Sequence, residues 1–163
     1  MLARTVPRPM REKLATFLEF AKSKILDASE ETLFKEIEEL VPQAQNEVGL
    51  TGKPTSMMSK FAFSLRPDIC SPYDARAREA LRKDTQIAYK GLDHDYVSYM
   101  DAYTRFKAEL IASNVLIHPM DYTYKGISLN ENLFWSRVAD KYLMVLGGFN
   151  IETIRKEASP YDI

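Results

Sequence analysis

Two residues of this chain combine a reactive side chain with a clear position in a predicted helix, Lys60 and Asp74. A lysine amine attacks an electrophilic carbon once burial or a neighbouring cation has lowered its pKa. Lys60 lies in the largely apolar segment 55–65, so partial burial of its stem is expected. Asp74 is expected in the first turn of the next helix, where a carboxylate could accept a proton or stabilise a cation developing on a sugar ring. These two residues are therefore the candidate catalytic pair.

Each of the two residues also has a structural explanation. Lysine stems commonly lie along apolar surfaces while the ammonium stays in water. An acid three residues after Ser71 fits a capping box, in which side chains satisfy the free backbone groups at a helix start. Taken alone, the residue types favour these structural roles over catalysis.

The region around Asp74 is the basic part of the chain. Residues 51–83 carry seven basic and three acidic side chains, whereas residues 27–48 carry seven acidic side chains and one lysine. The cations expected to contact nucleic-acid phosphates are Lys53, Arg76, Arg78, Arg82 and Lys83. A solvated helix face explains the same pattern, and the net charge of −1 argues against a strongly basic nucleic-acid binder.

The spacing of apolar residues predicts an all-α protein with six or seven helices. We expect a flexible N-terminal arm at residues 1–8 and a single helical domain at residues 9–163. The expected helices cover residues 10–26, 29 to about 48, 55–65, 71–89, 93–113, 130–146 and 151–158. In the second of these, Pro42 is expected either to end the helix or to kink it. The fourth is expected to have Ser71 as its N-cap and Pro72 in its first turn. Residues 115–126 are expected to form a loop or a small extended pair.

The remaining chemically notable residues favour structural roles. Tyr96, Tyr99 and Tyr103 recur at helical spacing, so a place in the core is favoured over stacking on bases. Cys70 is the only cysteine, which is typical of a reducing compartment such as the cytoplasm. It is expected to be a plain buried thiol. With two histidines, the chain shows no metal-ligand spacing, so neither a metal nor another cofactor is expected. Neither a membrane span nor a secretory signal is expected.

Two stretches resemble small bacterial proteins described as having an 8-oxoguanine DNA glycosylase fold. Residues 59–81, SKFAFSLRPDICSPYDARAREAL, resemble their Ser-Lys helix, Pro-Asp loop and Pro-aromatic-Asp helix start. Residues 137–148, RVADKYLMVLGG, resemble their closing Arg–Asp–Leu–Gly helix. The two stretches cover roughly a fifth of the chain and occur in the expected order.

The resemblance implies a divergent member of the helix-hairpin-helix glycosylase superfamily, whose enzymes act in DNA repair. It implies that Lys60 attacks the sugar carbon and that Asp74 supports this step, with residues 48–53 in the place of the hairpin. Two alternatives remain open. One is a module of the same fold that binds nucleic acid or a nucleotide without catalysis, and the other is a helical interaction protein, such as a homodimer.

Overall fold

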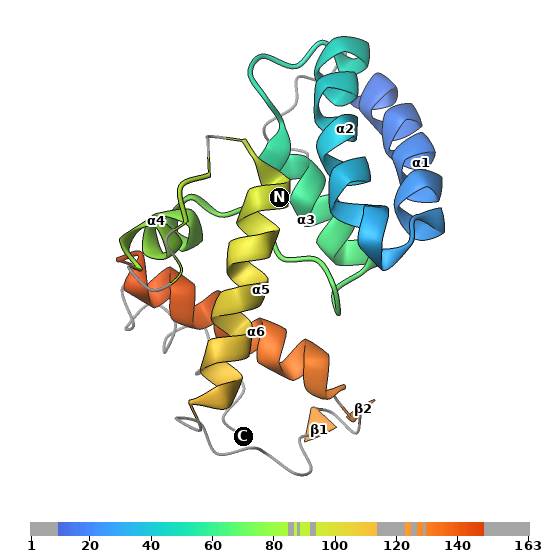
Figure 1. Cartoon of the computed structure of the whole chain (residues 1–163). Coiled ribbons are helices and arrows are strands. Elements are labelled where there is room, and N and C mark those ends of the chain that lie inside the picture. The colour runs from blue at the N-terminus through green and yellow to red at the C-terminus, as the bar shows by residue number, and fades with distance from the viewer. Residues whose placement is uncertain are drawn as a thin grey trace, which may run out of the picture. The chain divides into compact units, whose positions relative to one another are not determined.

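The computed structural model describes residues 10–84, 87, 89–91, 94–113, 123–124, 127–128 and 130–148. These residues form six helices and one short pair of strands, which confirms the predicted all-α class (Figure 1). The chain divides into two compact units. The first comprises residues 1–73 and 91–101, and the second comprises residues 74–90 and 102–163. The single domain predicted for residues 9–163 stays a prediction. The predicted arm and the helix at residues 151–158 lie outside the described residues.

In the first unit, three helices pack against one another: α1 (Arg11–Asp27), α2 (Glu30–Val48) and α3 (Thr55–Leu65). Figure 1 shows α1 and α2 side by side. Their apolar residues recur every three or four positions, and this spacing gives each helix one buried face. The buried side chains of α1 and α2 include Leu14, Phe17, Ala21, Ile25, Leu33, Ile37, Leu40 and Val41.

Local chemistry explains how these helices end. α2 continues through Pro42 and stops at Gly49, which has a φ of 78°. Glycine adopts this left-handed conformation without the steric cost that a side chain adds. The Arg66 guanidinium donates to the carbonyl oxygens of Ile25 and Ala28, at 3.5 and 3.3 Å. Arg66 therefore ties the segment after α3 to the end of α1.

Helix α5 (Tyr96–Ala112) begins in the first unit and continues into the second. Its tyrosines Tyr96, Tyr99 and Tyr103 are buried, as their spacing predicted. The rings of Tyr96 and Tyr99 pack with that of Tyr73 at centroid distances of 5.1 to 6.3 Å. In the first unit, the start of α5 thus forms an aromatic core with the segment that follows α3.

In the second unit, α4 (Ala75–Lys83) packs against α6 (Glu131–Leu146). The C-terminal part of α5 also contacts α6, because the Tyr103 hydroxyl donates to the Ser136 carbonyl at 2.7 Å. The strands β1 (Thr123–Tyr124) and β2 (Ile127–Ser128) form an antiparallel pair with Thr123 opposite Ser128. Of the loop or small extended pair expected for residues 115–126, the structure shows an extended pair, whose second strand lies beyond that range.

The predicted start of the fourth helix is wrong by three residues. Ser71 and Pro72 are not helical, and Asp74 is the N-cap. Hydroxyl groups from α5 explain the difference, since Tyr96 donates to the Ser71 carbonyl and Tyr99 to the Pro72 carbonyl. These carbonyls consequently have partners outside any helix.

The predicted end of the fourth helix is also wrong. α4 ends at Lys83, and Asp84 adopts an extended conformation. The Asp84 carboxylate accepts a hydrogen bond from the Ile87 backbone at 3.3 Å, which favours a turn in place of further helix.

Candidate functional site

Lys60 lies on α3 with its side chain exposed. The neighbouring positions Met58, Ser59 and Ala62 are buried, so α3 packs on the opposite face and directs Lys60 to solvent. Among the described residues, the structure gives the Lys60 ammonium no hydrogen bond or ion pair. Lys60 is thus accessible to a ligand, and the partial burial expected for its stem stays a prediction.

The residue before Lys60 is bonded to the residue before Asp74. The buried Ser59 hydroxyl accepts a hydrogen bond from the Tyr73 backbone N–H at 2.9 Å. Ser59 also donates to the Ser56 carbonyl of its own helix, at 3.1 Å, so both roles of the hydroxyl are filled. The helix that carries Lys60 thereby holds the chain segment that leads into α4. Lys60 itself belongs to the first unit and Asp74 to the second.

Asp74 is the N-cap of α4, and its carboxylate accepts a hydrogen bond from the Arg76 backbone at 2.8 Å. A carboxylate at this position satisfies a free N–H group and interacts favourably with the positive end of the helix dipole. The capping role expected for this acid is therefore confirmed, although Asp74 caps the helix directly and not as the acid of a capping box. One carboxylate oxygen is used in this way, and the side chain is half-buried.

The first turn of α4 lies directly against the end of α6. A Cβ added at Gly147 would meet the Arg76 carbonyl oxygen at 2.1 Å and its carbonyl carbon at 2.6 Å. Only glycine permits this backbone approach. The two stretches that carry the resemblance, residues 59–81 and 137–148, are thus in contact within the second unit at Arg76 and Gly147.

Asp140 is a buried acid on the α6 face that packs on α4. Burial raises the pKa of its carboxyl group, the charges of Arg137 and Lys141 oppose this, and the charge of Asp74 adds to it. The Arg137 guanidinium is 3.9 Å from the Asp140 carboxylate, a loose ion pair. The second unit therefore places two carboxyl groups, from Asp74 and Asp140, within electrostatic reach of each other.

The predicted phosphate-binding residues fall into two places. Arg76, Arg82 and Lys83 are exposed on α4, and Arg78 is half-buried there. Lys83 also pairs with Glu79 at 3.3 Å, one helical turn away on the same surface. Lys53 is exposed in the loop between α2 and α3, in the first unit.

Cys70 is buried, as predicted. Burial raises the pKa of its thiol to about 12, although a hydrogen bond with Tyr96 and the charge of Arg66 lower it. Burial also raises the pKa of the Tyr96 hydroxyl well above its usual value, with Cys70 and Tyr99 adding to the effect. Neither group ionises near neutral pH, so this cluster supplies packing and hydrogen bonds and no nucleophile.

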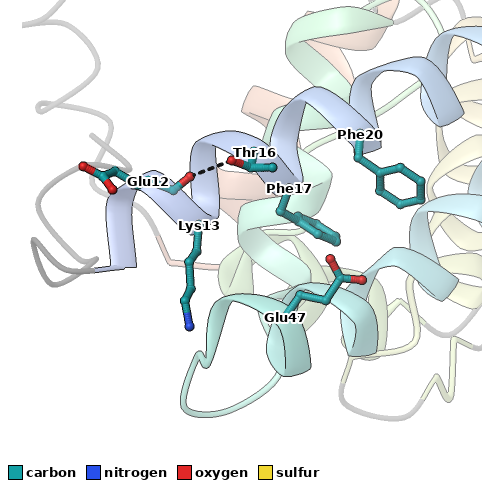
Figure 2. A pocket seen from close by; sticks show the side chains of 6 residues that line it. All are labelled: Glu12, Lys13, Thr16, Phe17, Phe20 and Glu47. Atoms are coloured by element: carbon teal, nitrogen blue, oxygen red, sulfur yellow. Dashed lines mark hydrogen bonds between the residues drawn. The ribbon is translucent and has the colours of Figure 1, made fainter.

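A hollow of about 570 Å³ lies along α1 and α2, and none of the predicted site residues lines it. Figure 2 shows its lining, which consists of five side chains from α1 and Glu47 from α2. Thr16 bonds to the Glu12 carbonyl at 3.1 Å, so its hydroxyl is engaged within its own helix (Figure 2). The hollow contains no group of residues suited to catalysis.

Among the described residues, no group of three or more His, Cys, Asp or Glu side chains could hold a metal ion. None of the described helices has the length and apolar character needed to cross a membrane. Comparison of the chain with models of known protein families, with curated proteins and with solved structures gave no match. The glycosylase relationship therefore stays a prediction from the sequence.

Reasoning from the sequence assigned no role in the candidate site to three residues described above, Ser59, Asp140 and Gly147. Asp140 had a detectable signal, because it is an acid between Ala139 and Leu143 on the apolar face of a predicted helix. Gly147 was interpreted as the end of that helix and as part of the resembling stretch 137–148, without a packing role. Ser59 had no signal, because its partner Tyr73 is fourteen residues away across a loop.

Proposed function

We propose that this chain is a DNA glycosylase-like protein that removes a damaged or modified base, with Lys60 as nucleophile and Asp74 as electrostatic support. The Lys60 amine would form a bond to C1′ of the deoxyribose as the C1′–N bond to the base breaks. The departing base would keep the electron pair of that bond and take up a proton. The Asp74 carboxylate would stabilise the positive charge that develops on the sugar ring.

The observation that supports this proposal most directly is the hydrogen bond from Tyr73 to the Ser59 hydroxyl. It joins the residues that immediately precede Asp74 and Lys60 in the chain. Lys60 is exposed on α3, so its amine is accessible to bound DNA. In the free protein the ammonium is hydrated, so activation of the amine requires bound DNA to exclude water from it.

A base-release assay on duplexes that carry oxidised or alkylated bases tests this function. Lys60→Ala should abolish release, while Lys35→Ala, at an exposed lysine of α2 in the same unit, should leave it unchanged. Asp74→Asn keeps a capping side chain but removes the charge, so release should fall by about 100-fold or more without loss of fold. Release that survives in Lys60→Ala would contradict the nucleophile assignment.

A second candidate is a module that binds nucleic acid without catalysis. The exposed cations Arg76, Arg82 and Lys83 on α4 favour it, because they could contact phosphates with no contribution from Lys60. This alternative predicts salt-sensitive DNA binding that is equal in wild type and Lys60→Ala, together with no release of any base.

A further inference from the structure

Helix α6 carries two cations on its outer surface, Arg137 and Lys141. They are four residues apart, so they lie one above the other on the same helix face. The Arg137 side chain is 44% exposed, and Lys141 is exposed as well. Neither residue is among the cations that the sequence predicted for phosphate binding.

The charges of these two cations act on Asp140, the buried acid on which the charge of Asp74 also acts. The charges of Arg137, Lys141 and Asp74 all act on the Asp140 carboxyl group. Asp140 is only 10% exposed in its side chain and lies 3.9 Å from the Arg137 guanidinium, which it helps to orient. Arg137, Lys141 and Asp74 therefore all lie within electrostatic reach of Asp140.

Contact between the two helices extends this positive region onto α4. The Arg76 backbone touches Gly147 at the end of α6, and the Arg76 side chain is exposed. The acid at the start of α6, Glu131, is nine residues before Asp140, roughly 13 Å along the helix axis. Arg76, Arg137 and Lys141 are thus three exposed cations on the packed α4–α6 pair, with Lys141 and Arg137 six and ten residues before Gly147 on α6.

The other charges of α4 also favour an anionic partner for this group. Helix α4 carries four basic residues and one glutamate. A polyanion is attracted by such a surface. The regular spacing of backbone phosphates suits cations that lie on two neighbouring helices.

We propose that Arg137 and Lys141 bind the phosphate backbone of DNA together with Arg76, which makes the α4–α6 surface the DNA-binding face of the second unit. The choice of DNA rests on the proposed function, but the binding itself does not require catalysis. Asp140 contributes only a loose ion pair with Arg137 to this arrangement.

The test measures the affinity for a duplex that carries one abasic-site analogue, by fluorescence anisotropy, between about 50 and 200 mM salt. Each phosphate contact contributes about 0.9 to the slope of log affinity against log salt concentration. Arg137→Gln and Lys141→Gln should each reduce the magnitude of the slope by about 1, and the double variant by about 2. Lys35→Gln, on acidic α2, should leave the slope unchanged.

Both substitutions are at exposed helix positions and introduce a residue that favours helix, so the far-UV circular dichroism should stay that of the wild type. An unchanged slope in the folded double variant would overturn the inference, as would a wild type that shows no salt-dependent binding. A reduced slope without any base release would contradict only the glycosylase function. Base release with unchanged slopes would contradict only this assignment.

Discussion

The contact between Gly147 and the Arg76 backbone gives a sharp prediction about the α4–α6 pair. Gly147 has a φ of −76°, so alanine is compatible with its backbone conformation and the conflict is purely steric. The added Cβ would lie 2.1 Å from the Arg76 carbonyl oxygen, and ordinary contact begins at 3.4 Å. The first turn of α4 must therefore retreat by about 1.3 Å, the difference between these two distances.

Overpacking of this kind costs typically about 1–3 kcal/mol, and the obstacle here is backbone that no rotamer change can move aside. We expect Gly147→Ala to lower the free energy of unfolding by about 3 kcal/mol. With a urea slope of about 2 kcal/mol per molar, the unfolding midpoint falls by about 1.5 M. Urea titration followed by far-UV circular dichroism measures this shift.

Gly148→Ala is the matched control. Nothing lies within 4 Å of a Cβ at Gly148, but its φ of 91° puts alanine in a strained conformation. This strain costs about 1–2 kcal/mol, so the control should be destabilised less than Gly147→Ala. If Gly147→Ala were as stable as the wild type, or no less stable than Gly148→Ala, the close packing of α6 on α4 would be refuted.

Four further predictions concern single side chains. Asp74→Ala should lower the stability by about 1 kcal/mol through loss of the cap, while Asp74→Asn, which can still cap, should keep most of it in the same urea titration. Ser59→Ala leaves the buried Tyr73 N–H without its partner and should cost about 1–3 kcal/mol, and an unchanged midpoint would contradict the importance of that bond. Burial raises the pKa of Asp140 in the folded state. Above the unfolded-state pKa of about 3.9, the unfolded chain loses this proton more readily than the folded protein, so the free energy of unfolding falls as pH rises. Asp140→Asn should therefore be more stable than the wild type at neutral pH, and this gain should shrink as pH falls toward 4; a constant difference across that range would contradict the assignment. The buried Cys70, with a pKa of about 12, should react with a thiol reagent only after unfolding in urea, so rapid reaction in buffer would show that the first unit opens.

The sequence predicted the helices well wherever apolar spacing alone decides the structure. α3 was predicted at residues 55–65, which are its observed bounds, and the α5 tyrosines were assigned correctly to the core. In these segments the 3.6-residue period and the proline at position 67 act locally.

The start of α4 was mispredicted because distant residues determine it. Ser71-Pro72 resembles a helix start, yet hydroxyl groups of Tyr96 and Tyr99, about 25 residues later, bind the Ser71 and Pro72 carbonyls. The Ser71 hydroxyl is buried and has no hydrogen-bond partner among the described residues, so it caps no helix. Local sequence rules cannot anticipate hydrogen bonds of this range.

The candidate site stays a prediction. Residue types and helix positions singled out Lys60 and Asp74, the resemblance gave them roles, and the structure shows Lys60 exposed. The α4–α6 contact was not anticipated, because Gly147 and Arg76 are 71 positions apart in the sequence and neither carries a pattern that pairs them. Asp140 and Arg137 became candidates for a functional role only because α6 packs on α4.

The most direct test of the central claim is borohydride trapping on a duplex that carries an abasic site, followed by peptide mapping of the adduct. Borohydride reduces the imine between an amine and the opened sugar to a stable bond, so the map identifies the attacking residue. The account predicts an adduct on Lys60 that is absent from Lys60→Ala and retained in Lys35→Ala. An adduct on another amine, an adduct that persists in Lys60→Ala, or DNA binding with no adduct would contradict Lys60 as the nucleophile.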